Sequence, residues 1–129
     1  MKDEQLIEIV ATDVMGWEIT VCLDDAETWP CLWKDMSLRS AAYWFVTDDD
    51  WDVWQDDTRA WNPLRNDNDC MAAWDKAGEI FTDGPMWLTR YHECWDATIN
   101  PDTPTKRAWA SDPDRRRAMV ECMAKAVTQ

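Results

Sequence analysis

Glycine and histidine are scarce in this sequence, which contains three glycines and a single histidine in 129 residues. The glycines stand far apart, so neither GxGxxG nor GxxxxGK(S/T) occurs and no glycine-rich phosphate loop can form. A Ser-His-Asp or Cys-His relay would need His92, and no serine or cysteine is tied to it by a recognisable spacing. We therefore expect a protein that is not an enzyme and that binds no cofactor.

The five cysteines do not form a recognisable framework, because their number is odd, their spacings are wide and no CxxC motif occurs. This pattern argues against a set of disulfides and against a zinc knuckle, so we expect reduced thiols. The aspartates between Asp48 and Asp52 resemble the start of a calcium loop. The glycine position of that loop holds Val53, however, and its glutamate position holds Arg59, so we expect no metal site.

No run of apolar residues reaches the length that crosses a membrane. The first residues, MKDEQLIEI, are acidic and amphipathic and do not resemble a signal peptide, so we expect a cytoplasmic protein without membrane contact. The net charge is −13, from 26 acidic against 13 basic residues, which disfavours direct binding to nucleic acid. Such a charge suits a solubilising surface, a basic protein partner or mimicry of a nucleic acid.

The clearest structural signal is the central segment from Trp61 to Phe81. It opens with Trp-Asn-Pro, whose proline disfavours a helical conformation at Asn62. The four residues from Asn66 to Asp69 can each cap a helix. An apolar stripe follows at helical spacing, made of Met71, Trp74, Ala77/Gly78 and Phe81. These features predict a helix over 67–80, ended by Thr-Asp-Gly-Pro.

The rest of the chain predicts further helices over 3–15 and 113–126, the first ended by Gly16 and the second begun by Asp112-Pro113. Residues 24–40 read as irregular. Strands are predicted at 18–23, 42–47, 51–54, 86–91, 93–99 and 107–110. Because most of these strands connect as hairpins, we expect a mostly antiparallel sheet. The predicted fold is a single α+β domain spanning residues 1–129, a small helix–sheet–helix sandwich.

Tryptophan is over-represented, with eleven residues against two phenylalanines and two tyrosines. Trp17, Trp74 and Trp109 fall on core-facing positions of the predicted elements. Other tryptophans lie on strands or loops near arginines and form a predicted ligand site, made of Trp51, Trp54, Arg59, Trp61, Trp87 and Arg90. Such a site stacks a base-like ring and holds phosphate through its arginines. The alternative is that most of these tryptophans fill a core that is short of phenylalanine.

The one dense basic run is Arg115-Arg116-Arg117, in the first turn of the last predicted helix, where cations meet an unfavourable dipole. One interpretation is that these arginines pair with the protein's own carboxylates. The other is an anion site, in which the helix N-terminus adds donors to the guanidinium groups. The neighbouring Asp112 and Asp114 favour the first interpretation.

Four places in the chain share their order and character with a known family. They are Val14-Met15-Gly16-Trp17, Trp61-Asn62-Pro63 with its cap and Ala72-Ala73-Trp74, Trp87 after Pro85, and Ala118, Cys122, Ala124 and Ala126 in the last helix. The set resembles the phage ABA-sandwich domain proteins, although residues 24–58 are longer and richer in tryptophan than is typical of that family. The resemblance implies a helix–sheet–helix sandwich encoded by a phage or prophage, and it supplies no catalytic residues.

Two functions agree with these observations. The first is a phage accessory protein that binds and hides a nucleotide-like small molecule, an immune signal of its host, at the Trp/Arg site. The second is an acidic inhibitor whose carboxylates, notably in residues 48–52 and 55–57, occupy the nucleic-acid groove of a basic host protein used in defence. The tryptophan excess favours the first. Either protein would act in the host cytosol, and a homo-oligomer is compatible with both.

Free-thiol titration of freshly purified protein tests the expectation of reduced cysteines. All five cysteines should react under denaturing, non-reducing conditions, because none is paired in the predicted fold. A count of three or fewer would contradict the prediction.

Overall fold

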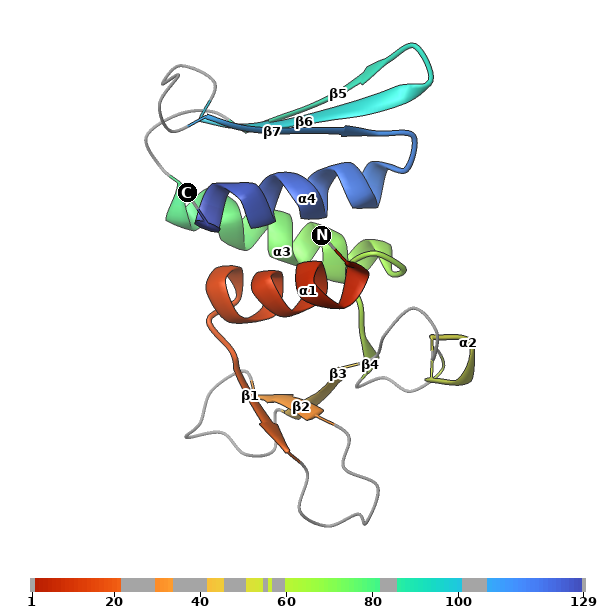
Figure 1. Cartoon of the computed structure of the whole chain (residues 1–129), viewed down its shortest axis with the longest axis vertical. Helices are drawn as coiled ribbons and strands as arrows, with labels where there is room; N and C mark the ends of the chain where they lie inside the picture. The colour runs from red at the N-terminus through yellow and green to blue at the C-terminus, as the bar shows by residue number, and fades with distance from the viewer. Residues whose placement is uncertain are drawn as a thin grey trace.

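The structure is a computed structural model that describes residues 2–21, 30–33, 42–45, 51–54, 56, 60–81, 86–100 and 107–128. Figure 1 shows a group of helices lying between two β-sheets, one from the N-terminal half of the chain and one from the C-terminal part. The predicted fold class, a small α+β fold with helices at the start, middle and end, is confirmed. No helix within these ranges is long and apolar enough to cross a membrane.

The first helix is α1 (Asp3–Ile9), which continues directly as a π-helical segment, η1 (Val10–Val14). Its core-facing side is buried and consists of Leu6, Ile7, Val10, Ala11 and Val14. Gly16 then adopts a φ of +73°, a left-handed conformation that glycine reaches without strain, and the helix ends. The predicted helix over 3–15 is therefore confirmed.

The central helix α3 (Asp67–Ile80) has the predicted bounds, but its buried stripe lies one residue away from the predicted one. Met71 is 40 % exposed, and Trp74 is only partly buried at the edge of the core. The fully buried positions are Cys70, Ala73 and Ala77. These small side chains face the next helix, where they let the two backbones approach closely, and the larger residues are displaced to the flanks.

The last helix is α4 (Arg115–Thr128), and it confirms the predicted C-terminal helix. Figure 1 shows α4 against one sheet, with α3 and α1 on its other side. Because it is covered from both sides, six of its residues are buried, namely Ala118, Met119, Val120, Cys122, Met123 and Ala124. The core of the molecule is therefore centred on this helix.

The upper sheet lies beyond α4 and confirms the predicted strands in this part of the chain. Its strands are all antiparallel, in the order β5 (Met86–Tyr91), β6 (Cys94–Ile99) and β7 (Ala108–Asp112). A two-residue turn, His92-Glu93, joins β5 to β6, and His92 has a φ of +55°. On the face toward α4, Ala97 lies opposite Ala110, so the helix meets a shallow alanine surface.

The lower sheet contains β1 (Glu18–Val21), β2 (Pro30–Trp33), β3 (Ala42–Phe45) and β4 (Ala60–Trp61), in that order. Neighbours pair antiparallel except β3 and β4, which are parallel. The prediction that residues 24–40 are irregular is wrong for β2. Pro30 does not prevent this strand, because it takes the first strand position, where a missing N–H is tolerated. The predicted strand at 51–54 is also wrong, because these residues form a short helix, α2 (Trp51–Trp54). Three aspartates precede it in the sequence, and aspartate favours a helix start.

A pair of tryptophans joins the lower sheet to the helices. Trp17 follows η1 and is 6 % exposed, and Trp61 ends β4 and is 3 % exposed. Their ring centroids are 5.1 Å apart at an interplanar angle of 67°, an edge-to-face contact. The prediction that Trp17 belongs to the core is confirmed.

Removing this contact should destabilise the protein strongly. We expect Trp61→Ala to lower the free energy of unfolding by about 3–5 kcal/mol, because it empties a buried site. Trp87→Ala serves as the control, since its indole is 57 % exposed, and should change stability by about 0.5 kcal/mol or less. Urea denaturation of both variants measures the difference, and equal losses would contradict this placement.

Candidate functional site

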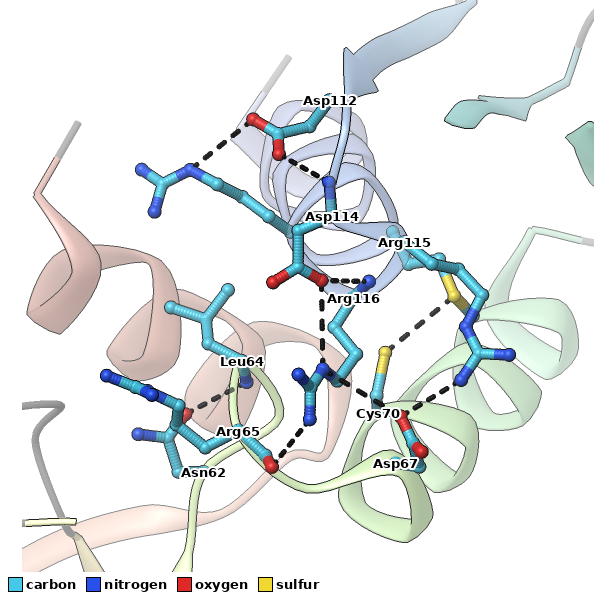
Figure 2. Close-up of polar contacts among 11 residues, drawn as sticks. Asn62, Leu64, Arg65, Asp67, Cys70, Asp112, Asp114, Arg115 and Arg116 are labelled. Carbon is cyan, nitrogen blue, oxygen red and sulfur yellow. Dashed lines mark hydrogen bonds and ion pairs between the residues drawn. The ribbon is translucent and has the colours of Figure 1, made fainter. Parts of the chain in front are cut away.

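Two clusters of polar or aromatic residues stand out in the described part of the chain, and the first is structural. It surrounds Asn62, which is fully buried between β4 and α3 (Figure 2). The Asn62 Oδ1 accepts from the Leu64 N–H at 2.9 Å, and its own N–H donates to Asp69 Oδ2 at 3.0 Å. Asn66 Oδ1 in turn accepts from the Asp69 N–H at 3.0 Å and caps α3. Every one of these bonds shapes the entry of the chain into α3.

The basic run at the start of α4 is anchored in the same cluster. Arg115 Nη2 lies 2.9 Å from Asp67 Oδ1, and Arg116 Nη1 donates to the carbonyl oxygen of Arg65 at 2.6 Å (Figure 2). The two arginines therefore tie the N-terminus of α4 to the N-terminal turn of α3 and the loop before it. The interpretation that this run pairs with the protein's own carboxylates is confirmed for Arg115.

Arg117 completes the pattern on the other side of α4. Its Nη1 donates to Asp3 Oδ1 at 2.6 Å, and its Nε donates to Glu121 Oε1 at 2.9 Å. The hydrogen bond to Asp3 is the largest reason why the pKa of this guanidinium is raised. The run thus joins α4 to α1 and α3.

The described thiols show no sign of chemical activation. Cys70, Cys94 and Cys122 are all free. Burial raises the pKa of Cys70 and of Cys122 to about 12, so these two are protonated and weakly nucleophilic at neutral pH. The Cys70 Sγ lies 3.7 Å from Met119 Sδ, a buried contact between α3 and α4.

The residues of the predicted ligand site fall into different parts of the molecule. Trp51 in α2 is 8 % exposed and Trp61 in β4 is 3 % exposed, and both belong to the lower half. The backbone of Trp54 lies in α2, whereas Arg59 lies outside the described residues. Trp87 is in the upper sheet, so the helices separate it from Trp61 (Figure 1).

The structure also places Trp87 and Arg90 on opposite faces of β5, because side chains alternate along a strand and these two are three residues apart. Arg90 pairs in register with Trp95, and its guanidinium carbon lies 5.7 Å from the centroid of that indole. Arg90 is therefore engaged with an aromatic ring of its own molecule, on the face opposite to Trp87.

The second cluster is the outward face of the upper sheet, hereafter the outer face. The face that carries the buried alanines meets α4, so the alternate residues of each strand point away from the helices (Figure 1). These residues are Trp87, Thr89, Tyr91, Cys94, Asp96, Thr98, Trp109 and Ser111. Of the five exposed large hydrophobic residues in the described chain, three lie here. Exposed apolar residues gathered in this way mark a binding surface.

The arrangement within the outer face follows from the strand register. Thr98 lies in register between Trp87 on β5 and Trp109 on β7, and it is only 9 % exposed. In the next row, Asp96 lies between Thr89 and Ser111. Two large aromatic side chains thus flank a hydroxyl, with a carboxylate and two further hydroxyls about 7 Å along the strands.

Tyr91 extends the aromatic part of the outer face toward the β5–β6 turn. It is 64 % exposed, the highest fraction among the large hydrophobic residues of the described chain. Its ring meets that of His92 edge-on, with centroids 4.3 Å apart. Asp96 carries the only full charge among the eight side chains of the outer face. The face is consequently aromatic and hydroxyl-rich with one negative group.

Trp109 is the residue of this face that sequence reasoning placed wrongly, because it is 49 % exposed instead of core-facing. A signal was present in the alternation Ala108-Trp109-Ala110-Ser111. The period of two puts both alanines on one side and tryptophan with serine on the other. The serine identifies the tryptophan side as the outward one.

No protein-family model, curated protein or solved structure matches this chain. The resemblance to the phage ABA-sandwich domain proteins therefore stays a prediction. The outer face is the most exposed aromatic surface of the described residues.

The buried carboxyl group of Asp69, in the first cluster, should make the stability of the protein depend on pH. Burial is the main cause that raises the pKa of Asp69 above its ordinary value of 3.8, and the hydrogen bond from Asn62 partly offsets it. A raised pKa favours the protonated acid in the folded state, so its contribution to stability is full at low pH and is lost as pH rises through the folded pKa. Asp69→Asn keeps an acceptor for Asn62 and has no charge to bury.

The stability of Asp69→Asn relative to the natural protein should therefore increase as pH rises from about 3.5 to 7, by up to about 1.4 kcal/mol for each pH unit by which the folded pKa exceeds the unfolded one. Urea denaturation at a series of pH values measures this. Asp75→Asn, on the exposed side of α3, controls for the change in net charge. If the stability of Asp69→Asn relative to the natural protein stays constant or decreases as pH rises, the predicted direction is wrong.

Proposed function

We propose that this is a non-enzymatic binding protein whose outer face docks a basic protein partner through that partner's arginine and lysine side chains. The observation that carries the proposal is the composition of the face, in which the exposed aromatics Trp87, Tyr91 and Trp109 surround one carboxylate, Asp96. Aromatic rings beside a carboxylate suit a cation, because the ring faces and the carboxylate all present negative potential.

An arginine side chain is the group that best matches this chemistry. Its planar guanidinium stacks on an indole and can also form two parallel hydrogen bonds to a carboxylate. The same kind of contact already exists inside the molecule, where Arg90 lies 5.7 Å from the ring of Trp95. Each such contact contributes about 0.5–1 kcal/mol when exposed and about 2 kcal/mol when desolvated.

The charge of the whole molecule supports a basic partner. A net charge of −13 attracts a positively charged protein over the Debye length and raises the rate of encounter. The same charge repels the phosphates of a nucleotide or nucleic acid. In the setting that the phage resemblance implies, the partner would be a host defence protein with a basic nucleic-acid groove, and the protein would act as an inhibitor in the host cytosol.

A second candidate is the sequestration of a nucleotide-derived immune signal, and one observation favours it. Trp87 and Trp109 are two strands apart, about 10 Å, with only Thr98 between them. A flat ring stacked between two indoles needs about 7–8 Å between their planes. The outward positions of the three strands hold no cation for the phosphate, which places this candidate second.

A titration with defined probes tests the proposal and separates the two candidates. A synthetic peptide rich in arginine should quench the tryptophan fluorescence and bind more weakly as salt increases. Trp87→Ala and Trp109→Ala should each weaken this binding by about 2- to 30-fold, the equivalent of 0.5–2 kcal/mol. Ile80→Ala is the matched control, because Ile80 is 45 % exposed but lies on α3.

A second pair of variants tests whether the peptide requires the charge of Asp96. Asp96→Asn and Asp75→Asn remove the same charge, one on the outer face and one on α3. Only Asp96→Asn should weaken the peptide appreciably if the face is the docking site. The second candidate would be established instead by a different result. In that case purine nucleotides quench the tryptophan fluorescence, this quenching is lost in Trp87→Ala, and the peptide does not change the fluorescence. If the binding of the peptide and the binding of the nucleotides are both independent of Trp87 and Trp109, both candidates fail.

A further inference from the structure

The open edge of β5 is a feature that the proposed function does not use. In the described part of the chain β5 has β6 on one side and no strand on the other. It is six residues long, and its outward residues Trp87 and Tyr91 are the two most exposed large hydrophobics. An unpaired edge strand of this length presents backbone N–H and C=O groups to any strand that can pair with it.

The β5–β6 turn shows which backbone groups of β5 face the open edge. Tyr91 and Cys94 pair across a two-residue turn and exchange backbone hydrogen bonds, so the backbone groups of Tyr91, Thr89 and Trp87 face β6. The bond from Lys125 Nζ to the carbonyl oxygen of Trp109, at 3.0 Å, agrees, because Trp109 pairs with Thr98, whose backbone groups face β5. By alternation, Leu88 and Arg90 direct their backbone groups toward the open edge.

The two edges of the upper sheet are therefore different. On β7, the Lys125 side chain of α4 occupies an edge carbonyl, and a lysine at an edge discourages pairing with another strand. No described side chain is bonded to the backbone of β5 in this way. The sheet can accept an additional strand at β5 more readily than at β7.

The sequence of β5 is self-complementary in one antiparallel register. If Thr89 lies opposite Thr89 of a second copy, Leu88 faces Arg90 of that copy and the two exchange backbone hydrogen bonds. Trp87 then faces Tyr91 of the second copy on the outward side. Because the axis is two-fold, this pair occurs twice. Aromatic cross-strand pairs and a threonine pair are favourable neighbours in an antiparallel sheet.

We infer that two copies of this chain associate through β5 and form one continuous six-stranded sheet in the order β7-β6-β5-β5-β6-β7. The interface is isologous, because both copies contribute the same strand. It does not require the proposed docking function, and the outer faces of the two copies lie on the same side of the joined sheet, with Trp87 and Tyr91 at the seam. The charge of −13 on each copy opposes association, so the dimer tightens as salt screens this repulsion.

A cysteine placed on the two-fold axis tests the register. Residues that face each other in a pair without hydrogen bonds have Cα atoms about 4.5 Å apart, within the range that a disulfide spans. Thr89→Cys should therefore give a covalent dimer on mild oxidation. Ser111→Cys, on the same face but on β7, should stay monomeric on a denaturing gel, as should the natural protein.

The unoxidised dimer is measured by light scattering on a sizing column, at about 0.05 M and about 0.5 M salt. The mass should approach twice 15.1 kDa, more completely at high salt. Thr89→Lys places like charges opposite each other, and Arg90→Pro removes an edge N–H without touching the β5–β6 ladder. Both variants should return the mass to 15.1 kDa while keeping the native circular dichroism, whereas Arg90→Ala should remain dimeric.

Three results would overturn the inference. One is a single-chain mass for the natural protein under all these conditions. Another is a dimer that survives both Thr89→Lys and Arg90→Pro. The third is cross-linking of Ser111→Cys with the same efficiency as Thr89→Cys.

Discussion

Close packing of α4 between two surfaces is the constraint on which the rest of the structure depends. On one side the helix meets β6 and β7, whose inward residues include Ala97 and Ala110, and on the other it meets α1 and α3. Small residues on both surfaces keep the layers near enough for a helix of buried methionines and alanines to fill the space. The arginines at its N-terminus fix its direction, because each is bonded to a different neighbouring segment.

Much of this architecture could be predicted where the signal is local. The bounds of α3 follow from a cap at Asn66, an apolar stripe and a Gly-Pro stop, and none of these depends on distant residues. The lower sheet was harder, because β2 is defined by its partners β1 and β3 and begins at a proline. A four-residue helix such as α2 makes only about one turn, which is too short to leave a periodic signal in the sequence.

The surface was predicted less well, for a physical reason. The strand period divides the residues of β7 between two faces, but the packing of α4 decides which face is buried. Only the polarity of Ser111 indicated the outward face, and Trp109 was assigned to the core although it lies outside. The separation of Trp87 from Arg90, in contrast, was available from the strand period alone. Of the predicted site residues whose side chains the structure describes, only Trp87 lies on the outer face, together with two aromatics that the prediction did not include.

The bond between Asp3 and Arg117 spans 114 residues, and it has a consequence for the chain as it is synthesised. At about 5–20 residues per second, roughly ten seconds pass between the appearance of α1 and that of the helix that covers it. During this interval the apolar side of α1, which includes Leu6, Ile7 and Val10, has no α4 to pack against. The upper sheet and α4 come from one continuous stretch of chain and can assemble locally, whereas α1 cannot pack against α4 until that stretch has been synthesised. Of the described helices, α1 is made before α3 and α4, and until α4 is made its apolar side remains a segment that a chaperone can bind.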